Sequence, residues 1–142
     1  EYFKKNTCDL LERITIAPSD FGRSYIEIEL VTENENSASN LYFSSEHNQL
    51  TVGFDNYHCH FDNFNEMDFE QEIKKAIECF YQILNEEFLV VSAGGGATRL
   101  LTHDEVHKLE NGHKLEKFDY DCINYYVISW SGKFDKIFKN RN

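Results

Sequence analysis

Alternation of hydrophobic and polar positions predicts β-strands in the first half of the chain. In the run 25–31, three aliphatic side chains share one face and two glutamates share the other: Ile26, Ile28 and Leu30 against Glu27 and Glu29. This pattern is typical of a half-buried antiparallel strand. Two shorter strands are expected at 41–43 and 50–54, and the polar stretch 33–40 indicates a turn. Neighbouring strands of this kind predict a β-meander.

After residue 67 the hydrophobic period changes to 3.6 residues, which predicts the principal helix. Apolar side chains form one stripe and charged side chains lie mostly opposite: Phe69, Ile73, Ala76, Ile77, Phe80, Ile83 and Leu84 against Glu70, Glu72, Lys74, Lys75 and Glu78. Asp68 is placed to cap this helix or to lie in its first turn, where a negative charge suits the helix dipole.

The rest of the chain predicts a hairpin, short helices and a last strand. Three further strands are expected at 88–91, 99–101 and 123–130. The glycine-rich stretch 93–97 is expected to form the turn between the first two of these. Thr102 and Glu105 have the spacing of a capping box, which predicts a short helix ending at about Glu110. Another short helix is expected at 2–12.

These elements predict an α+β fold, with a mainly antiparallel β-sheet packed against one principal α-helix and short accessory helices. The chain has 142 residues, no internal repeat and a single proline. We therefore expect one domain spanning 1–142. A domain of this length buries enough surface to fold without a disulfide or a metal ion.

Charge narrows the classes of partner. The chain has 25 acidic and 14 basic residues, and its formal net charge is -11. Affinity for phosphate backbones comes largely from Lys and Arg, so direct nucleic-acid binding is not expected. Basic proteins fit this charge better.

Membrane and redox signals point to a cytoplasmic protein. No stretch approaches 18 consecutive apolar residues, and the sequence begins without the apolar run of a secretory signal. The four cysteines have no CxxC spacing, and reduced thiols are expected: Cys8, Cys59, Cys79 and Cys122.

The segment Tyr57 to Asp62 contains the sharpest local cluster of chemical groups. On a strand, His58 and His60 share a face, and Asp62 follows two residues later. These three side chains, with His103 or His107 as a further ligand, would suit a hydrolytic metal site. Asn63 interrupts the HxHxDH pattern of one such hydrolase class, and paired imidazoles on a strand need no metal.

A long segment of the chain carries a single sign of charge. Between Arg23 and Lys74 there is no Lys or Arg, and the acidic residues in this interval are Glu27, Glu29, Glu33, Glu35, Glu46, Asp55, Asp62, Glu66, Asp68, Glu70 and Glu72. A field of one sign raises the association rate of an oppositely charged partner. Aromatic side chains among these acids, such as Tyr42, are suited to anchor that partner.

Short segments after Leu50 carry a family resemblance: 50–62 (LTVGFDNYHCHFD), the helix that follows, 89–92 (LVVS) and 128–135 (ISWSGKFD). In these segments the chain resembles small bacterial immunity proteins of polymorphic and contact-dependent growth inhibition toxin systems. The resemblance implies a cytoplasmic, non-catalytic inhibitor that binds one cognate toxin domain, commonly a nuclease. Such an inhibitor covers the active site or the substrate surface of its toxin.

We therefore expect an acidic face that binds a basic toxin domain, with no cofactor, no bound metal and no membrane contact. Ten residues are expected to contribute to that face: Glu27, Glu29, Glu33, Glu35, Asp55, Tyr57, His58, His60, Asp62 and Glu66. Two alternatives remain open. One is a small metal-dependent hydrolase built on the histidine cluster, and the other is an acidic adaptor or oligomeric scaffold.

Overall fold

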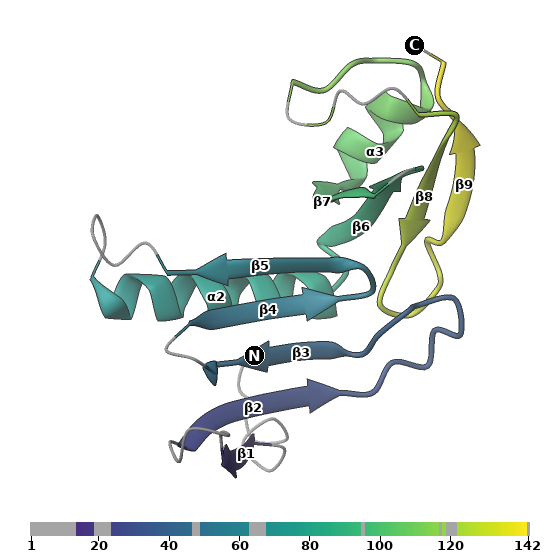
Figure 1. The fold of residues 1–142 in the computed structure, drawn as a ribbon. Coiled ribbons are helices and arrows are strands. Elements are labelled where there is room, and N and C mark those ends of the chain that lie inside the picture. The colour runs from purple at the N-terminus through teal and green to yellow at the C-terminus, as the bar shows by residue number, and fades with distance from the viewer. Residues whose placement is uncertain are drawn as a thin grey trace.

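The computed structural model describes residues 14–18, 24–46, 49–62, 68–94, 96–116, 118 and 122–141. Within these residues the chain forms two antiparallel sheets and two helices (Figure 1). The predicted α+β class is confirmed. The helix expected at 2–12 lies outside the described residues.

The first sheet is a five-stranded meander in which each strand pairs with the next along the chain. Its strands are β1 (Ile14–Pro18), β2 (Ser24–Leu30), β3 (Leu41–Ser44), β4 (Leu50–Phe54) and β5 (Tyr57–Phe61). The meander was predicted from the alternation of β2 and the two strands after it, whereas β1 was not predicted. The two-residue turn between β4 and β5 has a positive φ of 55° at Asp55. Turns with φ above zero at their first central residue match the twist of paired strands.

Helix α2 (Phe69–Leu84) covers one face of this sheet and contacts β3, β4 and β5. The Asp68 side chain accepts a hydrogen bond from the Gln71 N–H at 2.8 Å, so the predicted N-cap is confirmed. Side chains from the helix and from the sheet form the first hydrophobic cluster, with Ala76, Phe80 and Ile83 among its buried residues.

The apolar stripe of α2 is narrower than its sequence indicates. Phe69 and Ile77 were expected to be buried with the stripe, but they are 60% and 43% exposed. The helix contacts β3, β4, β5 and β6, and these contacts leave a large part of both side chains accessible to solvent. Glu72, expected on the polar side, is only 3% exposed, and its carboxylate lies 3.8 Å from the Lys75 ammonium group.

The second sheet has the strand order β7-β6-β8-β9. Its strands are β6 (Phe88–Ala93), β7 (Ala97–Thr102), β8 (Asn124–Ile128) and β9 (Lys136–Lys139). Helix α3 (His103–Glu110) packs against β6 and β7, and Thr102 and Glu105 form the predicted capping box. Strand β9 was not predicted. Neither of the described helices is long and apolar enough to cross a membrane.

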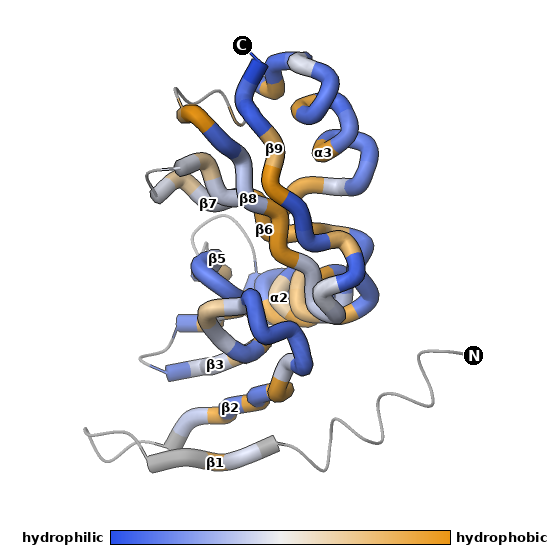
Figure 2. Tube along the Cα trace, turned by 90° about the vertical axis from the view of Figure 1, so that its right-hand side faces the viewer, coloured by the Kyte–Doolittle hydropathy of each residue, from blue (hydrophilic) through white to orange (hydrophobic). Residues whose placement is uncertain are grey.

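Strand β6 contributes to two hydrophobic clusters because its two faces pack differently. Val90 belongs to the first cluster, together with residues of α2 and of the first sheet. Leu89 and Val91 point the opposite way and join a second cluster beneath α3. Figure 2 shows the apolar β6 between the two helices. Strand β6 thus belongs to the second sheet and also packs against α2 and the first sheet.

Buried polar contacts fix the two sheets to each other, and we call Asn34, Ser129 and Asp135 the inter-sheet joint. The Asn34 amide group donates hydrogen bonds to the Ser129 carbonyl oxygen at 2.7 Å and to Asp135 Oδ2 at 3.0 Å. Asp135 Oδ1 accepts from the Ser129 N–H at 2.7 Å and from its hydroxyl at 3.0 Å. Asn34 precedes β3 and the other two residues follow β8, so the joint links segments far apart in the sequence.

Candidate functional site

The face of the first sheet that points away from α2 is polar. Residues paired across antiparallel strands point to the same side of a sheet, so the register defines two rows on this face. The rows are Glu27, Ser44, Thr51 and His60, and Glu29, Tyr42, Gly53 and His58. With Asp62, which follows β5, the functional side chains of these rows form what we call the imidazole–carboxylate face: Glu27, Glu29, Tyr42, His58, His60 and Asp62.

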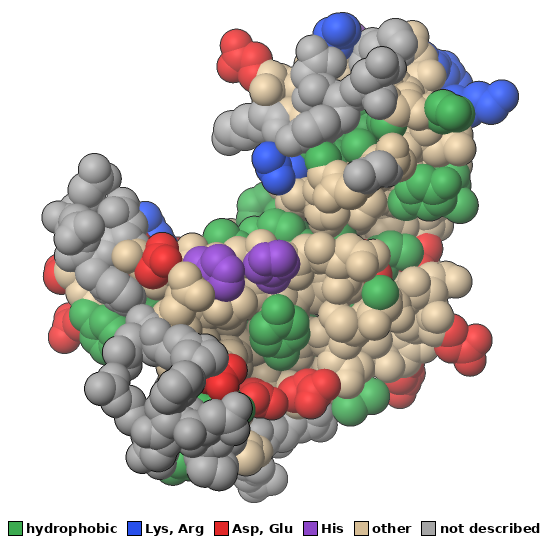
Figure 3. Space-filling model, viewed as in Figure 1, with side chains coloured by type: hydrophobic (Ala, Val, Ile, Leu, Met, Phe, Trp, Pro, Cys, Tyr) green, Lys and Arg blue, Asp and Glu red, His purple; other side chains and the backbone are tan. Residues whose placement is uncertain are grey.

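Figure 3 shows the two imidazoles side by side on this face, with an acidic side chain beside them and a row of acidic side chains below them in the view. The rings of His58 and His60 have centroids 5.4 Å apart and meet edge to face at 62°. Thr51 Oγ1 lies 2.9 Å from His60 Nδ1, which orients that ring. Both histidines are exposed. The prediction that they share a face is confirmed.

Tyr42 lies across Gly53 at the middle of the imidazole–carboxylate face. A Cβ atom added to Gly53 would overlap the Tyr42 ring, so the absence of a side chain lets the ring lie against the backbone of β4. A glycine inside a strand often marks such a close approach. The result is a large aromatic side chain in the same row as His58.

Two carboxylates of this face, those of Glu29 and Asp62, are oriented by neutral donors. The Asn40 amide group donates to Glu29 Oε1 at 2.7 Å, and the Gln49 amide group donates to Asp62 Oδ2 at 2.8 Å. Neither of these donors is a cation. Their hydrogen bonds position the carboxylates and leave the negative charge available to a partner.

The remaining predicted residues lie elsewhere. Glu33 and Glu35 are exposed on the loop between β2 and β3. Asp55 occupies the tip of the β4–β5 hairpin, where its Oδ1 accepts from the Ala38 N–H at 2.8 Å. Glu66 lies outside the described residues.

Tyr57 points toward the core and away from the imidazole–carboxylate face. It pairs with Phe54 and packs against the first hydrophobic cluster. Burial, with a further contribution from the neighbouring Cys59, raises the pKa of its hydroxyl group. The sequence places Tyr57 next to His58, but adjacent residues of a strand point to opposite sides.

The thiols of Cys59 and Cys79 also face inward. Cys59 pairs with Val52 on the core side of the sheet, so its thiol points away from both histidines, as strand alternation predicts. Burial in α2 raises the pKa of the Cys79 thiol to about 12, and Cys59 adds to the shift. Cys59, Cys79 and Cys122 are free thiols.

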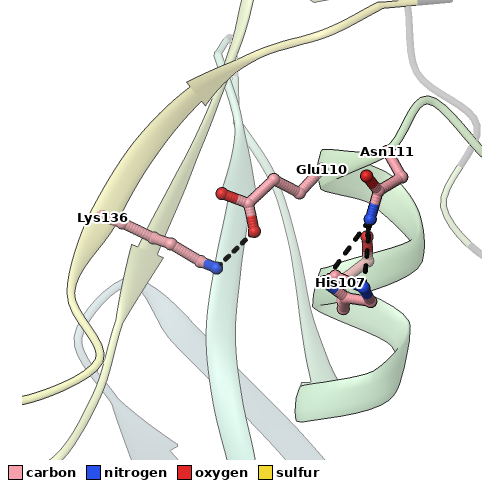
Figure 4. A network of polar contacts seen from close by, with 4 residues as sticks. All are labelled: His107, Glu110, Asn111 and Lys136. Carbon is pink, nitrogen blue, oxygen red and sulfur yellow. Dashed lines mark hydrogen bonds and ion pairs between the residues drawn. The ribbon is translucent and has the colours of Figure 1, made fainter.

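The side chains considered for a metal site do not converge. Among the described residues no group of three His, Cys, Asp or Glu side chains is arranged to hold a metal ion. His103 lies on α3, with its ring 4.6 Å from that of Phe134 and its Nε2 2.7 Å from the Glu86 carbonyl oxygen. His107 is on the same helix and contacts Asn111 (Figure 4). Both belong to the layer of the second sheet.

Comparison of the chain with family models, curated proteins and solved structures gave no match. The resemblance to immunity proteins therefore stays a prediction.

Proposed function

We propose that this protein is a cytoplasmic immunity protein that binds and neutralises a cognate bacterial toxin domain. The toxin domain has a basic surface, as nucleases do, and the imidazole–carboxylate face covers its active site or its substrate surface. The protein acts by binding, without a cofactor and without catalysis.

One observation supports this proposal above the others, namely that the face presents carboxylates and imidazoles without a competing cation from its own sheet. All strands from β2 to β5 lie between Arg23 and Lys74, an interval with no Lys or Arg. The negative charges of Glu27, Glu29 and Asp62 therefore lie on the same side of the sheet and add to one field. A protein surface that binds phosphate groups is basic. The negative field of these carboxylates raises the rate at which such a surface associates with them.

Steering alone does not provide tight binding. Exposed ion pairs contribute about 0 to 1 kcal/mol each, and affinity depends on a few well-packed anchors that lose their water on binding. Tyr42 and the ring of His58 lie in the same row and supply flat surfaces for this purpose. We expect the carboxylates to set the association rate and these rings to set the dissociation rate.

The first test is capture of the partner. The protein is immobilised and incubated at low salt with a lysate of the native host in which the product of the gene next to its own, the expected position of a cognate toxin gene, has been detected. Bound proteins are then eluted with a salt step. A basic toxin domain in stoichiometric amount, whose activity is abolished by one equivalent of the free protein, supports the proposal. Absence of such a domain from the eluate contradicts it.

A charge-reversal pair then tests the face. One variant carries Glu27→Lys, Glu29→Lys and Asp62→Lys. Its control makes the same change in net charge at exposed positions outside the face, with Glu78→Lys, Glu87→Lys and Glu116→Lys. The first variant should lower the association rate at low salt at least about tenfold more than the control and flatten its salt dependence. Equal rates and salt slopes for the two variants would show that the partner binds elsewhere.

A further inference from the structure

A cleft of about 540 Å³ lies between the second sheet and the tip of the β4–β5 hairpin. Ser92, Thr98 and Tyr126 pair across β6, β7 and β8, so their side chains share the face of the second sheet that forms one wall. The opposite wall comes from Asn36, Asp55 and Asn56. The volume falls within the range of about 300 to 1,000 Å³ that is usual for ligand pockets.

The cleft opens on the same side of the molecule as the imidazole–carboxylate face. In Figures 1 and 2, α2 and α3 lie on one side of their sheets. The imidazole–carboxylate face and the cleft wall formed by Ser92, Thr98 and Tyr126 belong to the opposite sides. The hairpin tip also connects the two features directly, because Asn56 is followed two residues later by His58. A partner lying on the face can therefore reach into the cleft.

The lining selects for a cation with several hydrogen-bond donors. Asp55 is the one charged residue among the described residues that line the cleft, and the other polar groups are amides and hydroxyls. The Tyr126 ring is 40% exposed and offers a face to a cation. Arg99, the neighbour of Thr98, projects from the other face of β7 by strand alternation, and its guanidinium group donates to the Thr98 carbonyl oxygen at 2.9 Å.

We infer that this cleft receives one arginine side chain of the protein partner, with its guanidinium group paired to Asp55 and stacked on Tyr126. A guanidinium group is planar and has five N–H donors, so it can bond to a carboxylate and to neighbouring oxygens while it stacks on an aromatic ring. The assignment of this arginine to a toxin domain rests on the proposed function. The chemistry of the cleft can be tested without the partner.

The partner-free test is a titration of the full chain followed by ¹H–¹⁵N chemical shifts, with acetyl-Gly-Arg-Gly-amide as the probe. The control probe carries citrulline, which has the shape of arginine without its charge. The arginine peptide should shift the amide signals of Ser92, Thr98 and Tyr126 in a saturable way, and the citrulline peptide should bind at least about fivefold more weakly. No saturable shift, or equal shifts with both peptides, would overturn the inference.

Asp55→Asn is the matched variant. Asparagine tolerates a positive φ, and its side-chain oxygen can still accept from the Ala38 N–H, so the hairpin should stay folded. We expect this change to weaken the arginine peptide about fivefold, whereas Glu78→Gln, which removes the same charge from α2, should leave it unchanged.

The two proposals fail in different ways. If a toxin domain is captured but Asp55→Asn alters neither its affinity nor that of the peptide, the cleft inference is wrong and the proposed function stands. If the arginine peptide binds in the cleft but no toxin domain is captured, the proposed function is wrong and the cleft remains a guanidinium site.

Discussion

Replacement of Asn34 by alanine should destabilise the protein strongly, because Asn34 holds the inter-sheet joint. The side chain is 6% exposed, and the Ser129 residue whose carbonyl it satisfies is 1% exposed. A buried acceptor left without a partner costs about 1 to 3 kcal/mol, and a hydrogen bond to a charged group such as Asp135 contributes about 1.5 to 3 kcal/mol. We expect a loss of about 3 kcal/mol. For a chain of this size, that lowers the melting temperature by about 9 °C.

Asn36→Ala is the matched control. Asn36 donates to the same Asp135 Oδ2 at 3.0 Å, but it is exposed, so water can replace its bond. Its loss should cost less than about 1 kcal/mol. Urea unfolding followed by circular dichroism measures both variants at pH 7. If the free energies of unfolding of the two variants differ by less than about 1 kcal/mol, the joint does not fix the sheets as described.

Three further predictions concern single sites. Gly53→Ala should destabilise the protein by about 1 to 3 kcal/mol in thermal unfolding, because the new methyl group overlaps the Tyr42 ring, and the added change Tyr42→Ala should recover part of this loss. Because burial keeps the thiol protonated, iodoacetamide at pH 8 should leave Cys79 unmodified in the native protein, and mass spectrometry should find it alkylated only after unfolding. The hydrogen bond from Lys136 lowers the pKa of Glu110, so this pair stabilises the fold above the unfolded pKa of a glutamate and is lost as pH falls through the folded pKa. Glu110→Gln should therefore lower the melting temperature at pH 7 and have no effect well below pH 4, and a pH-independent effect would exclude this linkage.

Strongly periodic segments could be predicted from the sequence, and the pairing of distant strands could not. Helix α2, the capping box of α3 and the meander all follow from local patterns. Strand β9 has four residues, two of them lysines, and its Ile137 is 66% exposed, so no hydrophobic alternation distinguishes it from a loop. The division into two sheets depends on the pairing of β6 with β8, which are separated by β7 and α3.

Local patterns also predict only part of the candidate site, because the rest depends on how distant strands pair. Strand alternation puts His58 and His60 on one face within a single segment. Their position on the same face as Glu27 depends on the register of three successive strand pairs, and turn lengths alone do not fix that register. Thr51, which orients His60, was missed because its role requires the pairing of β4 with β5.

The segment 128–135, which carries part of the resemblance to immunity proteins, has an internal structural role. Ser129 and Asp135 belong to the inter-sheet joint, and the Trp130 ring packs on Phe54 with centroids 5.7 Å apart. The side chains of Ser129, Trp130 and Asp135 thus connect the two sheets and do not belong to the imidazole–carboxylate face.

Stability and recognition should therefore separate by position. Changes at the joint should alter unfolding first, since its contacts are buried between the sheets. Changes at Glu27, Glu29 or Asp62 should alter association first, since these carboxylates lie on the open face. The side chains of Glu29 and Asp62 accept hydrogen bonds from neutral amides. Proteins that share only the joint would then be expected to share this fold while binding different partners. A common partner requires a similar open face.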